Sequence, residues 1–196
     1  MSLVDSGKRP AQPSEVVVYF RPDQAVTPQP PTEALVMRTR NKRFEPSVLA
    51  VPAGATVRFP NTDPILHNVF SVSKSNAFDM GLYGKGEGKS WTFTNPGLVR
   101  VYCNVHQSMV GHVLVLDTPF FSRLDASGQF QLQDIPDGPG RLYVWHERAR
   151  PLTRSLELPR EGQAMELELV LNQRTVPKHK NKFGKSYKRR SRRGRY

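Results

Sequence analysis

The stretch "LVRVYCNVHQSMVGHVLVL", residues 98–116, joins two apolar runs through a polar segment that holds the only cysteine of the chain. Alternation in the first run puts Val99, Val101 and Cys103 on one face of a strand and their polar neighbours on the other. The second run, "HVLVL" at 112–116, is apolar throughout and predicts another strand. We therefore expect Cys103 to point inward, at the end of a strand and the start of a turn.

The polar segment spaces three soft donors evenly, with Cys103, His106 and Met109 three residues apart. A thiolate and two imidazoles with a weak axial thioether make the blue-copper arrangement, so this spacing predicts a copper site that lacks one histidine. His67, in "NTDPILHNVF", is the best candidate because a polar loop turns into a strand there. The other histidines fit less well, as they lie in the strand after the cluster, in a later unit and in the tail: His112, His146 and His179.

Strand signals continue upstream of this stretch and fill residues 33–116. Short apolar runs alternate with turn signals such as Pro-Ala-Gly at 52–54 and Asn-Pro-Gly at 95–97. The 17 prolines and 14 glycines of the chain disfavour long helices. We predict an all-β protein in which residues 33–116 form a β-sandwich domain.

The flanking residues predict a second, smaller β unit. The run "VVVYF" at 16–20 precedes a proline-rich linker, and the runs "QFQLQ", "RLYVWH", "RSLELP" and "MELELVL" follow residue 117. The runs after 117 are few for a core of their own, so we expect "VVVYF" to pair with them. Residues 14–32 and 117–172 would then form one split β-sandwich unit, interrupted by the 33–116 domain.

The formal charge of +12 belongs to the end of the chain. Residues 174–196 hold eleven Lys or Arg and no acid, which leaves 12 − 11 = +1 for the rest. The segment 173–196 has no apolar periodicity, and we predict a basic disordered tail. Its charge is suited to a polyanion, namely a nucleic acid, an anionic lipid surface or an acidic partner protein.

Residues 45–116 resemble the cupredoxins, and among them the amicyanin-like branch with a Cys-x-x-His-x-x-Met ligand loop. The resemblance implies a Greek-key β-sandwich with one mononuclear type 1 copper. Carried over, His67 and His106 give imidazole nitrogens, Cys103 the thiolate and Met109 the axial sulfur. It also implies that Asn68 ties the two ligand loops together. One departure is Gln107, which stands where such loops often have proline, and this puts the stiffness of the loop in doubt.

The same resemblance implies single-electron transfer to a redox partner protein, with the ring edge of His106 as the exit and the apolar residues 64–66 as part of a docking patch. No small-molecule substrate and no catalytic residue are expected, so the protein is not expected to be an enzyme. Two alternatives stay open: a periplasmic copper carrier or storage protein, and an interaction protein anchored by its tail with a structural copper. Zinc fits less well because a thioether is a poor ligand for it.

Residues 117–172 resemble, through "SRLDASGQFQLQDIPDGPGRLYVWH", the transthyretin-like or carboxypeptidase-regulatory β-sandwich. The whole arrangement is similar to bacterial plastocyanin-like proteins labelled methylamine-utilisation proteins. That likeness implies a periplasmic location, with a signal peptide that is absent from this chain and presumed removed. No apolar run reaches the roughly 20 residues of a membrane span, so no transmembrane segment is expected. A surface pair of His146 and Glu147 is the simplest interpretation of "VWHER".

Overall fold

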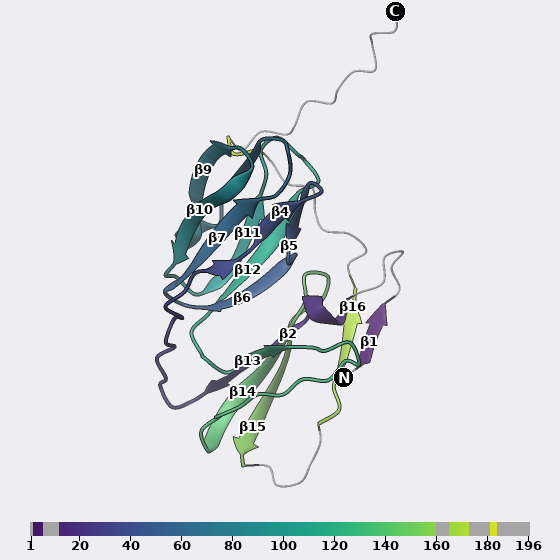
Figure 1. The fold of residues 1–196 in the computed structure, drawn as a ribbon. Coiled ribbons are helices and arrows are strands. Elements are labelled where there is room, and N and C mark those ends of the chain that lie inside the picture. The colour runs from purple at the N-terminus through teal and green to yellow at the C-terminus, as the bar shows by residue number, and fades with distance from the viewer. Residues whose placement is uncertain (1, 6–11, 160–164, 173–180, 184–196) are drawn as a thin grey trace, which may run out of the picture.

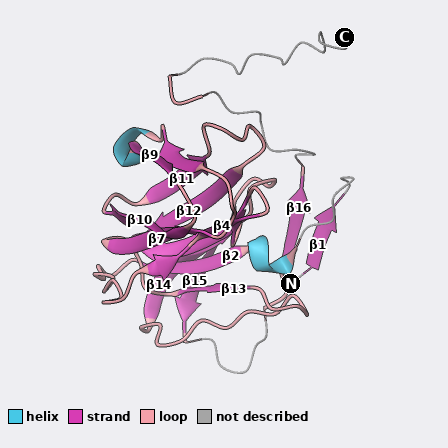
Figure 2. Cartoon of the chain, turned by 45° about the horizontal axis from the view of Figure 1, so that its top comes forward, coloured by secondary structure: helices cyan, strands magenta, loops and turns pink. Residues whose placement is uncertain are grey.

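The computed structural model describes residues 2–5, 12–159, 165–172 and 181–183. Within them the regular structure is strand, apart from two short 3-10 helices, η1 (Pro13–Glu15) and η2 (Lys74–Asn76) (Figure 2). The prediction of an all-β protein is confirmed. Within the same described ranges, no helix is long and apolar enough to cross a membrane. Most of the tail predicted to be disordered, 173–180 and 184–196, lies outside the described residues.

Two five-stranded sheets form the upper part of the molecule in Figure 1. The first has the order β10-β7-β4-β5, with β3 beside β7: β3 (Leu35–Val36), β4 (Arg38–Arg40), β5 (Arg43–Glu45), β7 (Ala55–Asn61) and β10 (Gly86–Phe93). The second has the order β6-β12-β11-β8-β9: β6 (Val48–Pro52), β8 (His67–Ser71), β9 (Phe78–Tyr83), β11 (Gly97–Tyr102) and β12 (Val110–Leu116). The turn-rich sequence thus folds as a sandwich in which short strands alternate between two layers.

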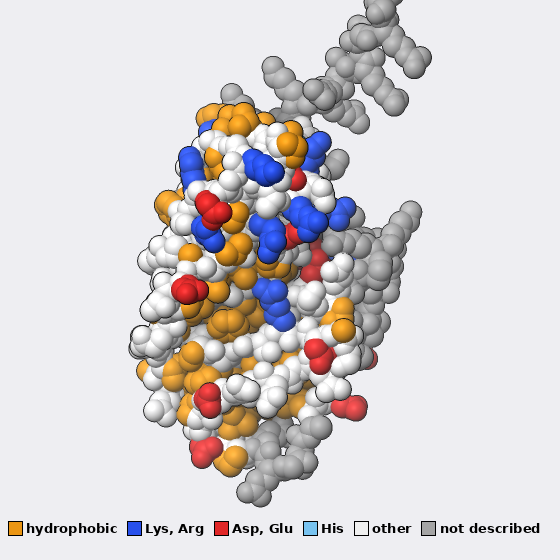
Figure 3. Space-filling view, in the orientation of Figure 1, with side chains coloured by type: hydrophobic (Ala, Val, Ile, Leu, Met, Phe, Trp, Pro, Cys, Tyr) orange, Lys and Arg blue, Asp and Glu red, His pale blue; other side chains and the backbone are white. Residues whose placement is uncertain are grey.

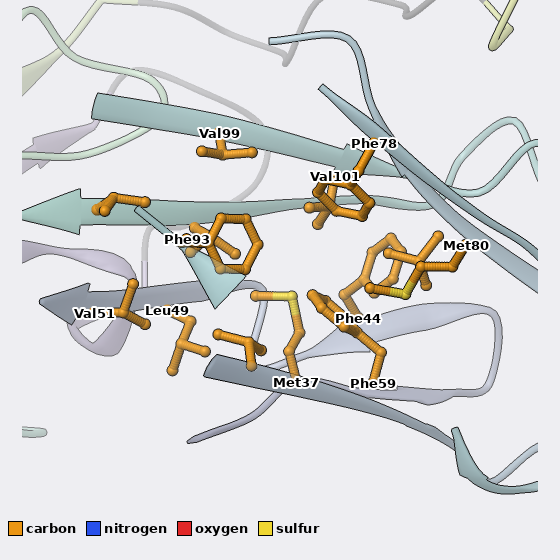
Figure 4. Packing of buried hydrophobic residues seen from close by; sticks show 14 of the residues in the cluster. Met37, Phe44, Leu49, Val51, Phe59, Phe78, Met80, Phe93, Val99 and Val101 are labelled. Atoms are coloured by element: carbon orange, nitrogen blue, oxygen red, sulfur yellow. The ribbon is translucent and has the colours of Figure 1, made fainter. Parts of the chain in front are cut away.

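The core of this sandwich is the apolar cluster between its two sheets. Strand β7 alternates buried and half-buried residues along its length, so it turns Val57 and Phe59 inward. Val99, Val101 and Cys103 enter the cluster from the opposite sheet, as the alternation in the sequence predicted. Figure 4 shows aromatic and aliphatic side chains of both layers meeting in this cluster.

Strands β6 and β12 are buried on both faces. One face enters the sandwich core, and the other packs Val48, Leu114 and Leu116 against Val17 and Trp145 of a further sheet. This explains why their sequences read as continuous apolar runs rather than alternating ones. Strand β12, which begins opposite the end of β11 next to Cys103, is therefore held from both sides.

The further sheet has the order β13-β2-β14-β15 and forms the lower part of Figure 1. It combines a strand from before residue 33 with strands from after residue 116: β2 (Val17–Pro22), β13 (Phe121–Arg123), β14 (Gly138–Trp145) and β15 (Leu152–Leu158). Its second face carries another apolar cluster, which includes Val18, Phe20 and Leu142. A parallel pair, β1 (Ser2–Asp5) and β16 (Glu168–Leu171), lies beside it.

One expectation about strands was wrong, and one strand was not predicted. Residues 129–133 form no strand, although Phe130 and Leu132 still pack on the lower cluster from an irregular segment. Asp125 explains the difference, because its carboxylate accepts hydrogen bonds from the amides of Ser127 and Gln129 and closes a turn there. Strand β1 was not expected, since the sequence around it is short and polar.

Candidate metal centre

Three of the predicted ligands converge at one end of the upper sandwich. His67 begins β8, Cys103 follows the last residue of β11, and His106 lies in the loop from β11 to β12. The potential ligand atoms of these three side chains all lie within 4.8 Å of one another. Residues 36 apart in the sequence therefore meet where neighbouring strands of one sheet begin and end.

Both imidazoles turn the same nitrogen toward the thiol. The Sγ of Cys103 lies 3.7 Å from Nδ1 of His67 and 3.5 Å from Nδ1 of His106. With metal–nitrogen and metal–sulfur bonds of about 2.0 and 2.3 Å, an ion between such atoms sets sulfur-to-nitrogen distances of about 3.5 Å in a tetrahedral site and about 3.7 Å in a trigonal one. The observed distances fit this range, so one metal ion can be bound by all three without rearrangement of the strands.

Burial divides the three residues into two groups. Cys103 and His67 are fully buried, whereas His106 is partly exposed. Burial lowers the pKa of His106, and the nearby His67 and Lys42 lower it further. The neutral imidazole, the form that binds a metal, is therefore favoured at this position.

Met109 closes the ligand loop and is buried in the sandwich core. Its amide donates to the carbonyl of His106 at 3.0 Å, and its carbonyl accepts from the amide of Cys103 at 3.3 Å. These bonds hold the loop in a compact turn. That its sulfur is a ligand stays a prediction.

Asp63 is a site residue that sequence reasoning missed. Its Oδ2 lies 2.8 Å from Nε2 of His67, on the side of the ring opposite the cluster. The amides of Asn41 and Lys42 donate to the same carboxylate at 2.7 and 3.0 Å. Burial raises the pKa of Asp63, but the hydrogen bonds from Lys42, His67 and Asn41 outweigh it and lower the pKa overall. An ionised carboxylate thus orients His67 and fixes the proton on Nε2, which leaves Nδ1 free.

The carboxylate is held by an unusual piece of backbone. Asn41 and Lys42, at the turn between β4 and β5, have φ angles of 51° and 57°. Two successive residues in the left-handed region turn their amides to the same side, which suits an anion. The signal for this contact in the sequence is only an acid four residues before a histidine, which is too common to be diagnostic.

Asn68 connects the two ligand loops, as the resemblance implied. Its Oδ1 accepts from the amide of Asn104 at 3.3 Å, beside Cys103. Its Nδ2 donates to Oδ1 of Asp79 at 2.7 Å and to the carbonyl of Gly81 at 2.9 Å. The start of β8, the ligand loop and β9 therefore share one hydrogen-bond network.

The remaining predictions about single residues had mixed outcomes. Met37 and Met80 pack in the upper core and Met165 against the lower cluster, as expected. The interpretation of His146 and Glu147 as a surface pair was wrong: His146 is 1% exposed, and the side chain of Glu147 is 9% exposed. Both lie where the lower sheet meets the upper sandwich, because Trp145 beside them packs into that contact.

Comparison with known proteins gives a match for the part of the chain that carries this cluster. Residues 33–116 match the family described as "Copper binding proteins, plastocyanin/azurin family". Cytochrome c oxidase subunit 2 of Thermus thermophilus is 32% identical over 77 residues, which are 37% of this chain and 57% of that protein. The chain thus spans about half of the length of the curated relatives it matches.

Solved structures give weaker likenesses. The copper-containing nitrite reductase of Thermus scotoductus has a TM-score of 0.42 at 27% identity, over 44% of this chain and 23% of the other. A reduced mutant of amicyanin has a TM-score of 0.41 at 25% identity, over 50% of this chain and 99% of the other. The match to a copper-binding family and the His, Cys, His cluster fall in the same part of the chain, residues 33–116, and this cluster can hold one copper ion.

Proposed function

We propose that residues 33–116 are a cupredoxin domain and that the protein carries single electrons between redox partners through one type 1 copper. The observation that carries the proposal is the cluster of Cys103 Sγ with the Nδ1 atoms of His67 and His106 at 3.7 and 3.5 Å. We propose these three residues as the strong ligands and Met109 as the weak axial one. A thiolate with two imidazoles is a donor set that both Cu(II) and Cu(I) accept.

Each residue has a separate role in this proposal. Copper, when bound, supplies the one-electron change between Cu(II) and Cu(I). The buried Cys103 would give the strongest bond to the metal, and the hydrogen bond from His67 to Asp63 prevents rotation of that imidazole. The two layers of the sandwich keep water from Cys103 and His67, while His106 brings a ring edge to the surface. A rigid site of this kind changes little between the two redox states.

We propose that the domain is a carrier and not an enzyme. The three clustered residues and Met109 all come from residues 67–109 of one domain, so with Met109 as the axial ligand four positions on the metal would be occupied by protein atoms. A catalytic metal keeps one position for substrate or water.

We further propose that residues 33–116 are an insertion into a split unit of residues 14–32 and 117–172, with a transthyretin-like fold. The pairing of β2 with β13 and β14 supports the split. A periplasmic location is part of the same proposal and rests on the domain family alone.

The test is the visible spectrum of the purified protein after addition of Cu(II). We expect an intense thiolate-to-copper band near about 600 nm at one copper per chain. It should be lost in Cys103→Ser and retained in His112→Gln, which removes a histidine outside the cluster. No such band in the wild type would refute the type 1 site. A reversible one-electron wave would then favour electron transfer, whereas rapid loss of copper to an apo-protein competitor would favour the alternative, a copper carrier or store.

A further inference from the structure

A short segment near the end of the chain lies against the copper end of the upper sandwich. Residues 181–183, drawn in yellow, lie at the top of Figure 1. Lys182 places its Nζ 2.7 Å from Oδ2 of Asp79, and its amide donates to Oδ1 of Asn104 at 3.4 Å. Asn104 is the residue between Cys103 and Val105, so the segment contacts the ligand loop itself. We call these two contacts the Lys182 clamp.

The clamp joins the network that connects the ligand loops. Asp79 accepts from Asn68 through its other oxygen, and the amide of Asn104 donates to Asn68. Burial raises the pKa of Asp79, but the hydrogen bonds from Lys182, Gly81 and Asn68 outweigh it and lower the pKa overall. The carboxylate therefore stays charged and can hold the ammonium group of Lys182 at neutral pH.

The surface around His106 is apolar at its centre. Four large apolar side chains are 37 to 57% exposed there: Ile65, Leu66, Leu82 and Val105. Leu66 and Leu82 flank the start of β8, since Leu82 pairs with Asn68 and a Cβ on Gly84 would lie 3.8 Å from Leu66. Phe183, at 72% exposure, follows Lys182 and adds another exposed ring at this end.

The rim of this surface is basic. Lys42 is exposed and close enough to lower the pKa of His106. The nearby acids are engaged, because Asp63 binds His67 and Asp79 binds Lys182. On the face seen in Figure 3, Lys and Arg side chains gather over the upper half of the molecule, whereas Asp and Glu are found over both halves. Beyond the clamp the sequence adds seven Lys or Arg and no acid in residues 184–196.

We propose that the Lys182 clamp brings the basic end of the chain to the copper site and so makes this end the docking surface for a redox protein with an acidic surface. The inference rests on the proposed function. In the docked pair, one electron passes from Cu(I) through the His106 edge to the acceptor, which leaves Cu(II) and a reduced acceptor.

The position of the clamp favours a protein over other polyanions. Positive charge alone is enough to bind a nucleic acid or an anionic membrane. For that purpose a basic tail could be attached at any point on the molecule. Here the described segment is held at Asn104, two residues before His106, and at Asp79. Complementary charge around an apolar centre steers encounter and then lets two redox sites come close.

The experiment measures electron transfer from the reduced copper-loaded protein to an oxidised c-type cytochrome with an acidic surface, by stopped flow at low salt. The decisive variant is Asp79→Asn, which releases the clamp but leaves an oxygen for Asn68. It removes a negative charge, so simple charge attraction predicts faster reaction with an acidic partner. We expect the opposite, a rate roughly three- to tenfold lower. At about 0.5 M salt the difference should disappear.

Lys182→Gln and Lys178→Gln provide a matched pair, since each removes one positive charge from the same segment. We expect Lys182→Gln to be the slower one by a similar factor. An unchanged or faster Asp79→Asn, or equal rates for the two lysine variants, would overturn the inference. So would an Asp79→Asn variant that loses binding to a 20-bp DNA duplex or to anionic vesicles while its rate with the cytochrome is unchanged.

A small cationic oxidant, tris(phenanthroline)cobalt(III), separates the two proposals. It needs no docking surface, so at about 0.5 M salt, where charges are screened, the wild type and the two lysine variants should react with it at the same rate and show the same visible band. If the wild type fails to react, the proposed electron-transfer function fails. If it reacts while the variants do not differ with the cytochrome, only the docking inference fails.

Discussion

Asp63 gives His67, a proposed copper ligand, a negatively charged neighbour, and this single carboxylate has three donors. Its oxygens receive the amides of Asn41 and Lys42 and lie 2.8 Å from Nε2 of His67. The residue is only 8% exposed, so water screens its charge poorly. A charge held this close to a ligand stabilises the more positive state of the metal.

Asp63→Asn removes that charge while keeping the size of the side chain. Cu(II) gains more than Cu(I) from the carboxylate, so we expect the reduction potential to rise by about 60 mV, which corresponds to tenfold in relative affinity. Voltammetry of the copper protein measures it. Asp117→Asn is the control, since Asp117 pairs with Arg21 and not with a ligand. A lower potential in Asp63→Asn would contradict this account.

Met109→Leu tests the axial ligand at nearly constant volume. If the sulfur donates weakly to copper, its loss disfavours Cu(II), so we expect the visible band to persist and the potential to rise by on the order of 50 mV. Met37→Leu makes the same change in the core and should leave the potential unchanged. Equal potentials for all three proteins would show that Met109 only packs.

The sequence was informative about the site where donors are close in the chain. The three-residue spacing of Cys103, His106 and Met109 is a local pattern, and His67 follows from its place at a strand start. Asp63 could not be predicted in the same way. Its role depends on a turn 21 and 22 residues earlier that aims two amides at it, and on the angle of one ring. Such contacts are set by tertiary structure and leave no periodic signal.

At the scale of elements, Gly88 of β10 lies against the backbone of β7 and leaves no room for a side chain. It lies at a register shift between the strands, with a φ of 75°, and a Cβ there would be 1.8 Å from the carbonyl oxygen of Phe59. We expect Gly88→Ala to lower the free energy of unfolding by roughly 3 kcal/mol, because backbone must move. Chemical denaturation of the apo-protein measures it.

Gly86→Ala is the matched control for Gly88→Ala. Gly86 also has a positive φ, of 144°, but no atom lies within 4 Å of an added Cβ. We expect Gly86→Ala to lower the free energy of unfolding by only about 1 kcal/mol. Similar costs for the two variants would mean that the contact with Phe59 relaxes freely.

Strands were predictable where burial imposes a simple pattern. The continuous apolar runs of β6 and β12 match burial on both faces, and the alternation of β7 matches burial on one. Residues 129–133 alternate apolar and polar residues but form no strand. The alternation there indicates only which side chains face the lower cluster. After the turn closed by Asp125, an irregular segment also places Phe130 and Leu132 against that cluster. Whether a neighbouring strand forms backbone hydrogen bonds with such a segment depends on tertiary structure.

At the scale of the whole molecule, the upper sandwich and the lower sheet share a contact that is apolar in part and polar in part. Val17 and Trp145 supply the apolar part with β6 and β12. The polar part includes a hydrogen bond of 2.8 Å from Ser47 to Glu15. Within the upper sandwich, Ser47 is held beside β12, because its carbonyl accepts from the amide of His112 at 2.9 Å. Folding of the two parts is coupled through this contact, so its titratable groups affect the stability of the entire chain.

His112 is the group that gives this contact a pH dependence. It is 1% exposed beside Trp145. Burial is the main cause that lowers its pKa to about 4; Arg100 and His146 contribute in the same direction, and Glu15 partly offsets them. The Oε2 of Glu147 lies 3.1 Å from Nδ1, yet that nitrogen has no hydrogen-bond partner among the described residues. The folded state therefore holds His112 neutral at pH values where the unfolded chain, with a histidine pKa near 6.5, is already protonated.

His112→Gln should make stability less sensitive to acid. A base whose pKa is lowered on folding contributes no pH dependence above about 6.5, and below it the unfolded state binds the extra proton, so stability falls with pH down to about 4. Between pH 7 and 4.5 we expect the wild type to lose roughly 2 kcal/mol more than His112→Gln, by denaturant titration at each pH. His179→Gln, which removes a histidine of the C-terminal tail, should keep the wild-type slope. Parallel slopes for wild type and His112→Gln would mean that His112 is protonated in the folded state, and Glu147 would then be its counter-ion.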